Sequence, residues 1–436
     1  MIDRLRLPVF CIACLFSAAL TAQPELPDQN MANAAAYAEA MGGAAVLIMQ
    51  NDSIVYAAYH NGADTSVVTH IFSATKAFWA IAAAAALESG LIDSYEERVS
   101  ATITEWQNPQ VHPFKNAIRI KHLLSLSSGL SQDVAYIQGL DAAAPDIYQY
   151  VIDSLDLNFA PSNAFQYGPS HYYAFGLLLE RKLQQAGLSQ NPLEYLDSLI
   201  FEPIGLEYGD WAHDASGNPH IPNGCYINPR EWVKFGQLLL HKGNWQGTQL
   251  VDSIFVEDLL VADGPNLGHG KFLWLNTNGG HGAYPIQSAP PGSPGGFMYH
   301  DGYTEIIGAL GAGKNRMYII PSLHLIAIRQ TSGDTGDFSD HAFLSHLLEG
   351  VAVSVAAAPL REAVMVYPNP AGTEVWVEAP AGYDQATVIN ASGRVMAHYT
   401  LRDNHRIDLS NWPAGVYFIQ LSGGPVPITR KLVKRQ

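Results

Sequence analysis

Residues 70–87 read HIFSATKAFWAIAAAAAL, and this stretch decides how the rest of the chain is interpreted. Ser73 and Lys76 are three positions apart, so on a helix they lie about one turn apart on the same face. Residues 77–87 are apolar on every side, which is the pattern of a helix buried in a core. We therefore predict that Lys76 lies at the mouth of a buried helix. Loss of hydration there disfavours the ammonium form and lowers the lysine pKa.

An uncharged lysine beside a serine hydroxyl indicates nucleophilic catalysis. The neutral amine can accept the hydroxyl proton of Ser73 and leave an activated nucleophile. Unpaired backbone amides at the start of the helix would favour a developing oxyanion. Ser-x-x-Lys also arises by chance, and the alternative is a surface serine that caps a helix next to a solvated lysine. The apolar helix favours the catalytic interpretation, because a lysine is rarely buried without a role.

Composition limits the possible partners and the location of the protein. The 436 residues are enough for two or three domains, and the formal net charge of −16 argues against nucleic acid and anionic membranes as partners. Residues 1–22 predict a secretory signal peptide, with a basic start, an apolar run and a small-residue exit. A membrane anchor and a lipoprotein site at Cys14 are the alternatives. We expect no transmembrane span in the mature chain, and Cys225 would remain alone without an intrachain disulfide.

Apolar periodicity predicts an α+β domain over residues 30–355. Residues 44–59 carry two β-rich runs across an Asn-Asp turn and indicate a hairpin, and residues 306–328 carry three further strands. Helices are expected between them, over residues 73–88, 118–130, 170–187 and 228–243. We expect one antiparallel sheet, completed by both ends of the domain and flanked by helices, together with a helical subdomain.

Near residue 358 the sequence pattern changes from mixed helices and strands to short strands alone. Residues 356–364 indicate a linker, and residues 365–436 consist of short alternating strands separated by Pro, Gly and Ser turns. This spacing is typical of a small all-β sandwich.

A third catalytic group is needed to carry the proton to the leaving group, and a phenol can do this. Tyr167 is the candidate, because it precedes a predicted helix in a turn stiffened by Gly168 and Pro169. The alternative is a half-buried packing tyrosine, since the chain contains 21 tyrosines.

Together these segments resemble the serine β-lactamase and penicillin-binding-protein superfamily. The resemblance spans residues 43–332 and rests on Ser73-Ala74-Thr75-Lys76, on Tyr167, and on IRIKHLLSLSSGL at 118–130 and KFGQLLLHKGNWQG at 234–247. The branch that it resembles contains class C β-lactamase-like esterases, D-aminopeptidases and 6-aminohexanoate oligomer hydrolases. The Ser-x-x-Lys element is the acylating motif of such enzymes.

The resemblance implies a role for each of these residues. Ser73 would be the acyl-enzyme nucleophile, Lys76 its base or proton relay, and Tyr167 the partner base and later acid. The oxyanion hole would use the amides of Ser73 and Ala312, because residues 308–321 are similar to the family's third-motif strand. His300-Asp301-Gly302 is a competing assignment for that motif. The implied reaction needs no metal and no cofactor, and the candidate substrate-binding residues are Ser170, Trp274, His300, Gly311 and Gly313.

Trp274 could instead be a core residue, and His300 a solvated loop residue. Two departures from the family pattern bear on the substrate. Pro169 stands where an asparagine often contacts β-lactam amides, and Lys314 falls past the glycine pair of the third motif. Both features put penicillin hydrolysis in doubt, whereas hydrolysis of an ester or a small amide needs neither. The implied alternatives are a D-aminopeptidase, a carboxypeptidase, a β-lactamase, or a silent relative that binds peptidoglycan or peptides.

The last seventy residues resemble the C-terminal sorting domain of the bacterial type IX secretion system. The segments VYPNP at 366–370, NASGRV at 390–395 and AGVYFI at 414–419 carry this resemblance. It implies export across both membranes, recognition by the secretion machinery, and a final location outside the cell or on its surface, with removal of the module. A carbohydrate-binding or spacer sandwich is the alternative.

Overall fold

The computed structural model describes residues 24–435 except 109, 111–112, 133–145, 189–190, 278–286, 289–297, 332, 334–336, 352–363, 380–381, 391–393, 402–404 and 424–427. The predicted signal peptide and residues 356–363 of the predicted linker therefore lie outside the described residues. Within the described part, no helix is both long and apolar enough to cross a bilayer.

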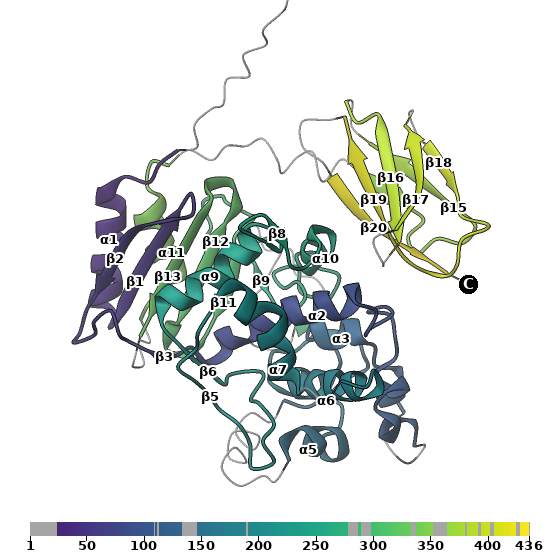
Figure 1. Ribbon diagram of the computed structural model, residues 1–436, viewed down its shortest axis with the longest axis horizontal. Helices are drawn as coiled ribbons and strands as arrows, with labels where there is room; N and C mark the ends of the chain where they lie inside the picture. Colours follow the sequence, from purple (N-terminus) through teal and green to yellow (C-terminus); the bar gives the residue numbers. More distant parts are fainter. Residues whose placement is uncertain are drawn as a thin grey trace, which may run out of the picture.

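A six-stranded antiparallel sheet forms the centre of the larger domain (Figure 1). Its strand order is β2-β1-β13-β12-β11-β9, so both ends of the domain complete one sheet, as predicted. The strands are β1 (Ala45–Gln50), β2 (Ser53–Tyr59), β9 (Trp274–Leu275), β11 (Ile307–Leu310), β12 (Arg316–Ile320) and β13 (Leu325–Gln330). Every residue of β1 is buried, because helices cover the sheet on both faces.

The two faces of the sheet are covered by different helices. Met317 of β12 contacts α9 (Pro229–Leu240), whereas its neighbour Tyr318 stacks on Phe343 of α11 (Asp340–Leu348). Successive side chains of a strand point to opposite faces, so these helices lie on opposite sides. The helix α1 (Asp28–Ala40) packs against α11.

The stretch that contains Ser73 and Lys76 forms a short 3₁₀ helix, η1 (Phe72–Ala77), followed by α2 (Phe78–Glu88), whose residues are buried except at its end. The remaining helices and strands are β3 (Thr69–His70), α3 (Ile120–Leu124), α5 (Ile147–Ser154), β4 (Ala164–Phe165), α6 (Ser170–Gln185), α7 (Pro192–Leu196), α8 (Glu202–Ile204), β5 (Asp210–Trp211), β6 (Cys225–Ile227), β7 (Asn244–Trp245), β8 (Thr248–Gln249), α10 (Ser253–Leu259) and β10 (Gln287–Ser288).

Local sequence signals explain the ends of several helices. The Asn228 side chain accepts a hydrogen bond from the Arg230 amide and so begins α9 as an N-cap. Gly90 adopts a left-handed conformation directly after α2. The helix predicted over residues 118–130 is wrong in extent. It comprises only α3, because Leu126 and Gly129 both take positive φ values, of 54° and 84°, and reverse the chain.

The C-terminal residues form a sandwich of two antiparallel sheets, as predicted. One sheet contains β14 (Met365–Tyr367), β15 (Glu374–Glu378) and β18 (His405–Asp408). The other has the order β17-β16-β19-β20 and contains β16 (Gln385–Asn390), β17 (Val395–Thr400), β19 (Gly415–Ser422) and β20 (Ile428–Lys434). The sandwich has a hydrophobic core of its own between these sheets.

Candidate active site

A sharp turn places Ser73 at the start of η1. Phe72 has a φ of 49°, a left-handed conformation that costs an aromatic residue conformational energy and that clusters at functional sites. The turn is held by pairing of β3 with β6 and by the bond from the Ile71 amide to the Cys225 carbonyl, 3.1 Å. Ser73 is half-buried, so solvent reaches it. Its amide lies in the first turn of η1, where a helical amide has no carbonyl partner within the helix.

Lys76 is buried directly beneath Ser73. Its Nζ lies 2.8 Å from Ser73 Oγ and donates a 2.8 Å hydrogen bond to the carbonyl of Pro222. The residue is only 6% exposed, and burial lowers the lysine pKa to about 7. In its neutral form, an amine that donates to Pro222 can turn its lone pair toward the serine hydroxyl.

The aromatic ring of Tyr167 lies close to the Lys76 amine. Its ring centroid is 5.2 Å from Lys76 Nζ, and the ring of buried Tyr172 is at the same distance. Trp274 of β9 packs against Tyr167 with ring centroids 5.5 Å apart. The structure therefore brings Ser73, Lys76 and Tyr167 together. Trp274 packs beside Tyr167 but is only 7% exposed and belongs to the hydrophobic core, which fits the alternative of a core residue.

A buried polar cluster supports the turn that carries Tyr167, and the sequence analysis did not identify it. His171 is fully buried, with Nδ1 2.9 Å from Ser128 Oγ and Nε2 2.9 Å from the Gln166 carbonyl. Gln132 accepts a 2.9 Å hydrogen bond from the Ser170 amide. Burial lowers the pKa of His171 to about 4, so the ring is neutral at pH 7. No motif marked these residues, because their partners are distant in sequence.

The end of β11 packs closely against the start of η1. A Cβ on Gly311 would lie 2.0 Å from the Ile71 carbonyl oxygen and 3.1 Å from the Ala74 amide nitrogen, so only glycine fits. The Gly311 amide donates to the Asn315 carbonyl at 2.8 Å and is thereby occupied. Ala312 follows, is exposed, and begins the 3₁₀ turn η6 (Ala312–Lys314), which contacts η1. Both predicted oxyanion-hole residues thus lie at one junction.

Arg316 binds the backbone of this junction at the Gly311 carbonyl, and the sequence analysis overlooked it. Its Nη1 donates to the carbonyls of Gly311 and Asn315, at 2.7 and 3.0 Å. Its Nε donates to Asp340 at 2.6 Å. Burial lowers the pKa of Arg316, but Asp340, Tyr318 and Tyr167 together outweigh it and raise the pKa. The Gly311 carbonyl and the Ala312 amide belong to one peptide unit. A cation on the carbonyl therefore fixes and polarises the amide at the other end.

The other predicted substrate-binding residues have different surroundings. Ser170 is fully buried, and its hydroxyl donates to the Ser131 carbonyl at 2.6 Å, so it supports α6. His300 is exposed, and its ring lies 4.9 Å from that of His341 on α11. Gly313 lies in η6 with a φ of 64°.

Comparison with known families agrees with this fold. Residues 28–342 match the family described as Beta-lactamase, and residues 365–435 match the secretion system C-terminal sorting domain. The fold and site define the class of serine hydrolases that includes β-lactamases and penicillin-binding proteins. The chain belongs to the Beta-lactamase family. The sorting domain marks it for type IX secretion to the cell surface or beyond. No curated protein matches the sequence significantly.

Solved structures share the fold at low sequence identity. A candidate 6-aminohexanoate-dimer hydrolase from Bacillus anthracis has a TM-score of 0.57 and 17% identity, covering 71% of this chain and 78% of its own. A D-stereospecific amidohydrolase from Streptomyces has a TM-score of 0.53 and 15% identity, covering 75% and 100%. A penicillin-binding-protein homologue from Caulobacter crescentus has a TM-score of 0.53 and 17% identity, covering 75% and 97%.

The close approach of Gly311 to η1 gives a testable prediction. Gly311→Ala should lower the free energy of unfolding by about 1–3 kcal/mol, because the added Cβ must push the strand from the helix start. The matched control is Gly333→Ala, whose Cβ meets open space and should change stability by less than about 0.5 kcal/mol. Urea denaturation followed by circular dichroism measures both. Equal stabilities of the two variants would contradict this contact.

Proposed function

We propose that this chain is an exported serine hydrolase that cleaves an ester or amide bond through an acyl-enzyme on Ser73. The observation that carries the proposal is the 2.8 Å contact between Ser73 Oγ and the buried Lys76 amine, whose pKa lies near 7. At that pKa a large fraction of the amine is neutral at physiological pH, so it can serve as a base. A solvated lysine would remain protonated and could not.

The arrangement supports a two-step reaction. Ser73 Oγ attacks the substrate carbonyl carbon while its proton passes to Lys76 Nζ. The tetrahedral intermediate then expels the leaving group, which takes a proton from the Tyr167 hydroxyl, and Lys76 returns its proton to Tyr167. Water next attacks the acyl carbonyl, gives its proton to the same pair of groups, and releases the acid. Ser73 recovers its hydroxyl proton, so no proton is gained or lost by the enzyme.

The developing negative charge would be held by two backbone amides, those of Ser73 and Ala312. Arg316 supports this assignment, because its bond to the Gly311 carbonyl aligns the Ala312 peptide. Amides fixed in this way need no reorganisation when the charge develops.

The surroundings of the third motif favour simple esters or small amides over β-lactams. Arg316 is committed to backbone carbonyls and to Asp340. Lys314 lies in a left-handed turn with a φ of 62°, after Gly313. Pro169 begins α6 and has no side-chain amide to offer a substrate. A D-amino-acid amide is also a substrate to test, because a D-stereospecific amidohydrolase shares this fold.

Labelling by a fluorophosphonate probe tests the nucleophile. The full chain should be labelled covalently, and Ser73→Ala should not, because phosphonylation requires an activated hydroxyl. Ser410→Ala is the matched control, since Ser410 is exposed on the sorting domain, where its hydroxyl bonds Asp408, and it takes no part in the proposed chemistry. Intact-protein mass spectrometry measures the adduct. A wild-type chain that stays unlabelled would favour a silent binding protein.

The lysine pKa predicts the pH dependence of ester hydrolysis. The active form is the neutral amine, so kcat/KM should rise with pH up to about 7 and then level off. Lys76→Arg should lose about 10²-fold or more in kcat/KM, because a guanidinium stays charged at these pH values. A p-nitrophenyl ester assay over pH 5–9, corrected for spontaneous hydrolysis, provides the profile. A plateau that begins near pH 5 would show that Lys76 is not the base.

Removal of the Tyr167 hydroxyl tests the proton carrier. Tyr167→Phe should keep the packing against Trp274 but lower kcat by about 10²-fold or more, since general acid–base catalysis contributes at least that much. Tyr367→Phe is the control, because that phenol is on the sorting domain and bonds Glu378. Steady-state kinetics with an alkyl ester, whose leaving group needs a proton, gives the comparison. Unchanged turnover would remove Tyr167 from the mechanism.

A further inference from the structure

The strand β19 of the sorting domain is buried on both faces. Its residues Tyr417, Ile419 and Leu421 belong to the core of the sandwich. Val416 and Phe418 point the other way, where a sandwich normally meets water, yet they are only 5% and 2% exposed. Both belong to the hydrophobic core of the hydrolase domain. The hydrolase domain therefore covers this outer face.

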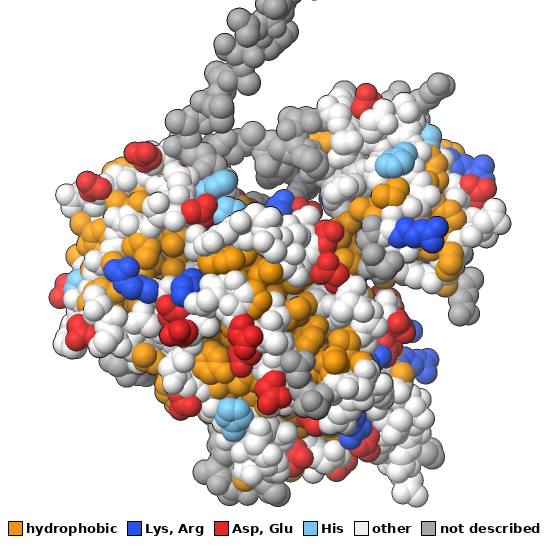
Figure 2. Space-filling view, viewed as in Figure 1, with side chains coloured by type: hydrophobic (Ala, Val, Ile, Leu, Met, Phe, Trp, Pro, Cys, Tyr) orange, Lys and Arg blue, Asp and Glu red, His pale blue; other side chains and the backbone are white. Residues whose placement is uncertain are grey.

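The helix α10 provides the apolar part of the contact. The ring of Phe255 meets the ring of Phe418 edge to face, with centroids 5.7 Å apart and an interplanar angle of 80°. Ile389 of β16 and Lys431 of β20 are the register partners of Phe418, so all three side chains stand in one row on the outer face. Figure 2 shows the sorting domain against the hydrolase domain, with acidic and hydrophobic side chains at the junction.

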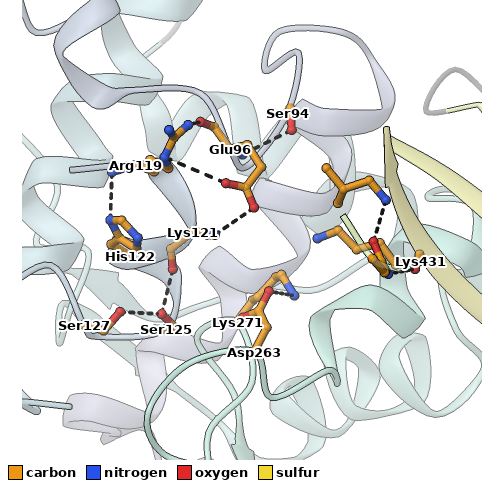
Figure 3. Close-up of polar contacts among 12 residues, drawn as sticks. Ser94, Glu96, Arg119, Lys121, His122, Ser125, Ser127, Asp263, Lys271 and Lys431 are labelled. Atoms are coloured by element: carbon orange, nitrogen blue, oxygen red, sulfur yellow. Dashed lines mark hydrogen bonds and ion pairs between the residues drawn. The ribbon is translucent and has the colours of Figure 1, made fainter. Parts of the chain in front are cut away.

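Lys431 supplies the polar part of the contact. Figure 3 shows its side chain projecting from the sorting domain toward Lys271 and Asp263 of the hydrolase domain. Its Nζ lies 3.5 Å from Asp258 Oδ1 and 5.8 Å from the ring centroid of Tyr95. The Asp258 side chain is 2% exposed and that of Lys431 is 18% exposed, so this pair is largely removed from water.

Two lysines, one from each domain, share the Asp258 carboxylate. Lys271 is fully buried, with its Nζ 3.6 Å from Asp258 and 3.4 Å from Asp263. Burial would lower the pKa of Lys271, but the two carboxylates outweigh it and raise the pKa. Burial raises the pKa of Asp263, but the nearby lysines, Lys271, Lys431 and Lys121, outweigh it and lower the pKa. Lys431 is the one of these three cations that comes from the sorting domain.

We propose that this row of residues is a specific docking surface, which holds the sorting domain on the hydrolase domain at α10. Its apolar part is Val416, Phe418 and Ile389, which join the hydrophobic core of the hydrolase domain, with Phe418 against Phe255. Its polar part is Lys431, which pairs with Asp258 and lies near Asp263. An aromatic pair removed from water is typical of the core of an interface. The desolvated charge pair beside it adds specificity, because either charge left buried without its partner would be costly. The linker then joins two domains that already bind each other, and the sorting domain keeps one orientation.

The experiment cuts the folded chain between the domains. A protease recognition sequence is inserted after residue 351, the full chain is cleaved, and the two fragments are followed by size-exclusion chromatography over a dilution series. We expect the wild-type fragments to elute together at micromolar concentration. Phe418→Ser and Lys431→Glu should each raise the fragment dissociation constant by about tenfold or more, as hot-spot changes do.

The matched control is Arg406→Met, which removes an exposed charge that pairs with Glu374 on the other sheet of the same sandwich. Its fragments should dissociate within about twofold of the wild type. Circular dichroism of each released sorting domain shows whether the substitution left it folded, and Lys431→Met provides a milder second variant. Separation of the wild-type fragments on cleavage would overturn the proposal. So would equal dissociation constants for Phe418→Ser, Lys431→Glu and Arg406→Met.

Discussion

The burial of one amine is the constraint on which the site depends. Lys76 can act on Ser73 only while water is kept from its Nζ, because hydration would restore the charge and the ordinary pKa. The alanine-rich helix α2 and the carbonyl of Pro222 provide that dry environment. An amine held partly neutral in this way lowers stability, since the unfolded chain binds its proton more tightly. Burial of Lys76 therefore costs stability, and in the proposed mechanism it is also what makes Ser73 reactive.

Backbone conformation and close packing around Ser73 are the second part of this constraint. Gly311 lets β11 reach the start of η1, and the left-handed Phe72 turns the chain so that Ser73 faces the same junction. A side chain at Gly311 would separate the strand from the helix and leave the Ala312 amide out of position. Arg316 bonds the Gly311 carbonyl, and its bond to Asp340 connects this junction to α11. The proposed oxyanion hole thus depends on the contact between Gly311 and the start of η1, two segments that are more than 200 residues apart in the chain.

Those distances explain what could be predicted from sequence. The hairpin of β1 and β2, the start of α9 at Asn228 and the apolar helix α2 follow from signals within a few residues of each element. The excess length predicted for α3 came from leucines that keep a helical period while Leu126 turns the backbone. The roles of His171 and Arg316 were missed, because they depend on partners that no local pattern reveals. Ser170 shows the same limit, since its neighbours leave its hydroxyl no access to substrate.

The strand β19 shows how far an apolar pattern can be interpreted. Its run Val416-Tyr417-Phe418-Ile419 fits a sandwich strand, but alternation would leave every second residue polar if water lay outside. An unbroken apolar run instead indicates a strand with a neighbour on each face. Here the second neighbour is α10, and the lysine beside Phe418 finds the buried carboxylate of Asp258. The same rule that identified α2 as a core helix, apolar residues on every side, therefore also marks the place where the two domains meet.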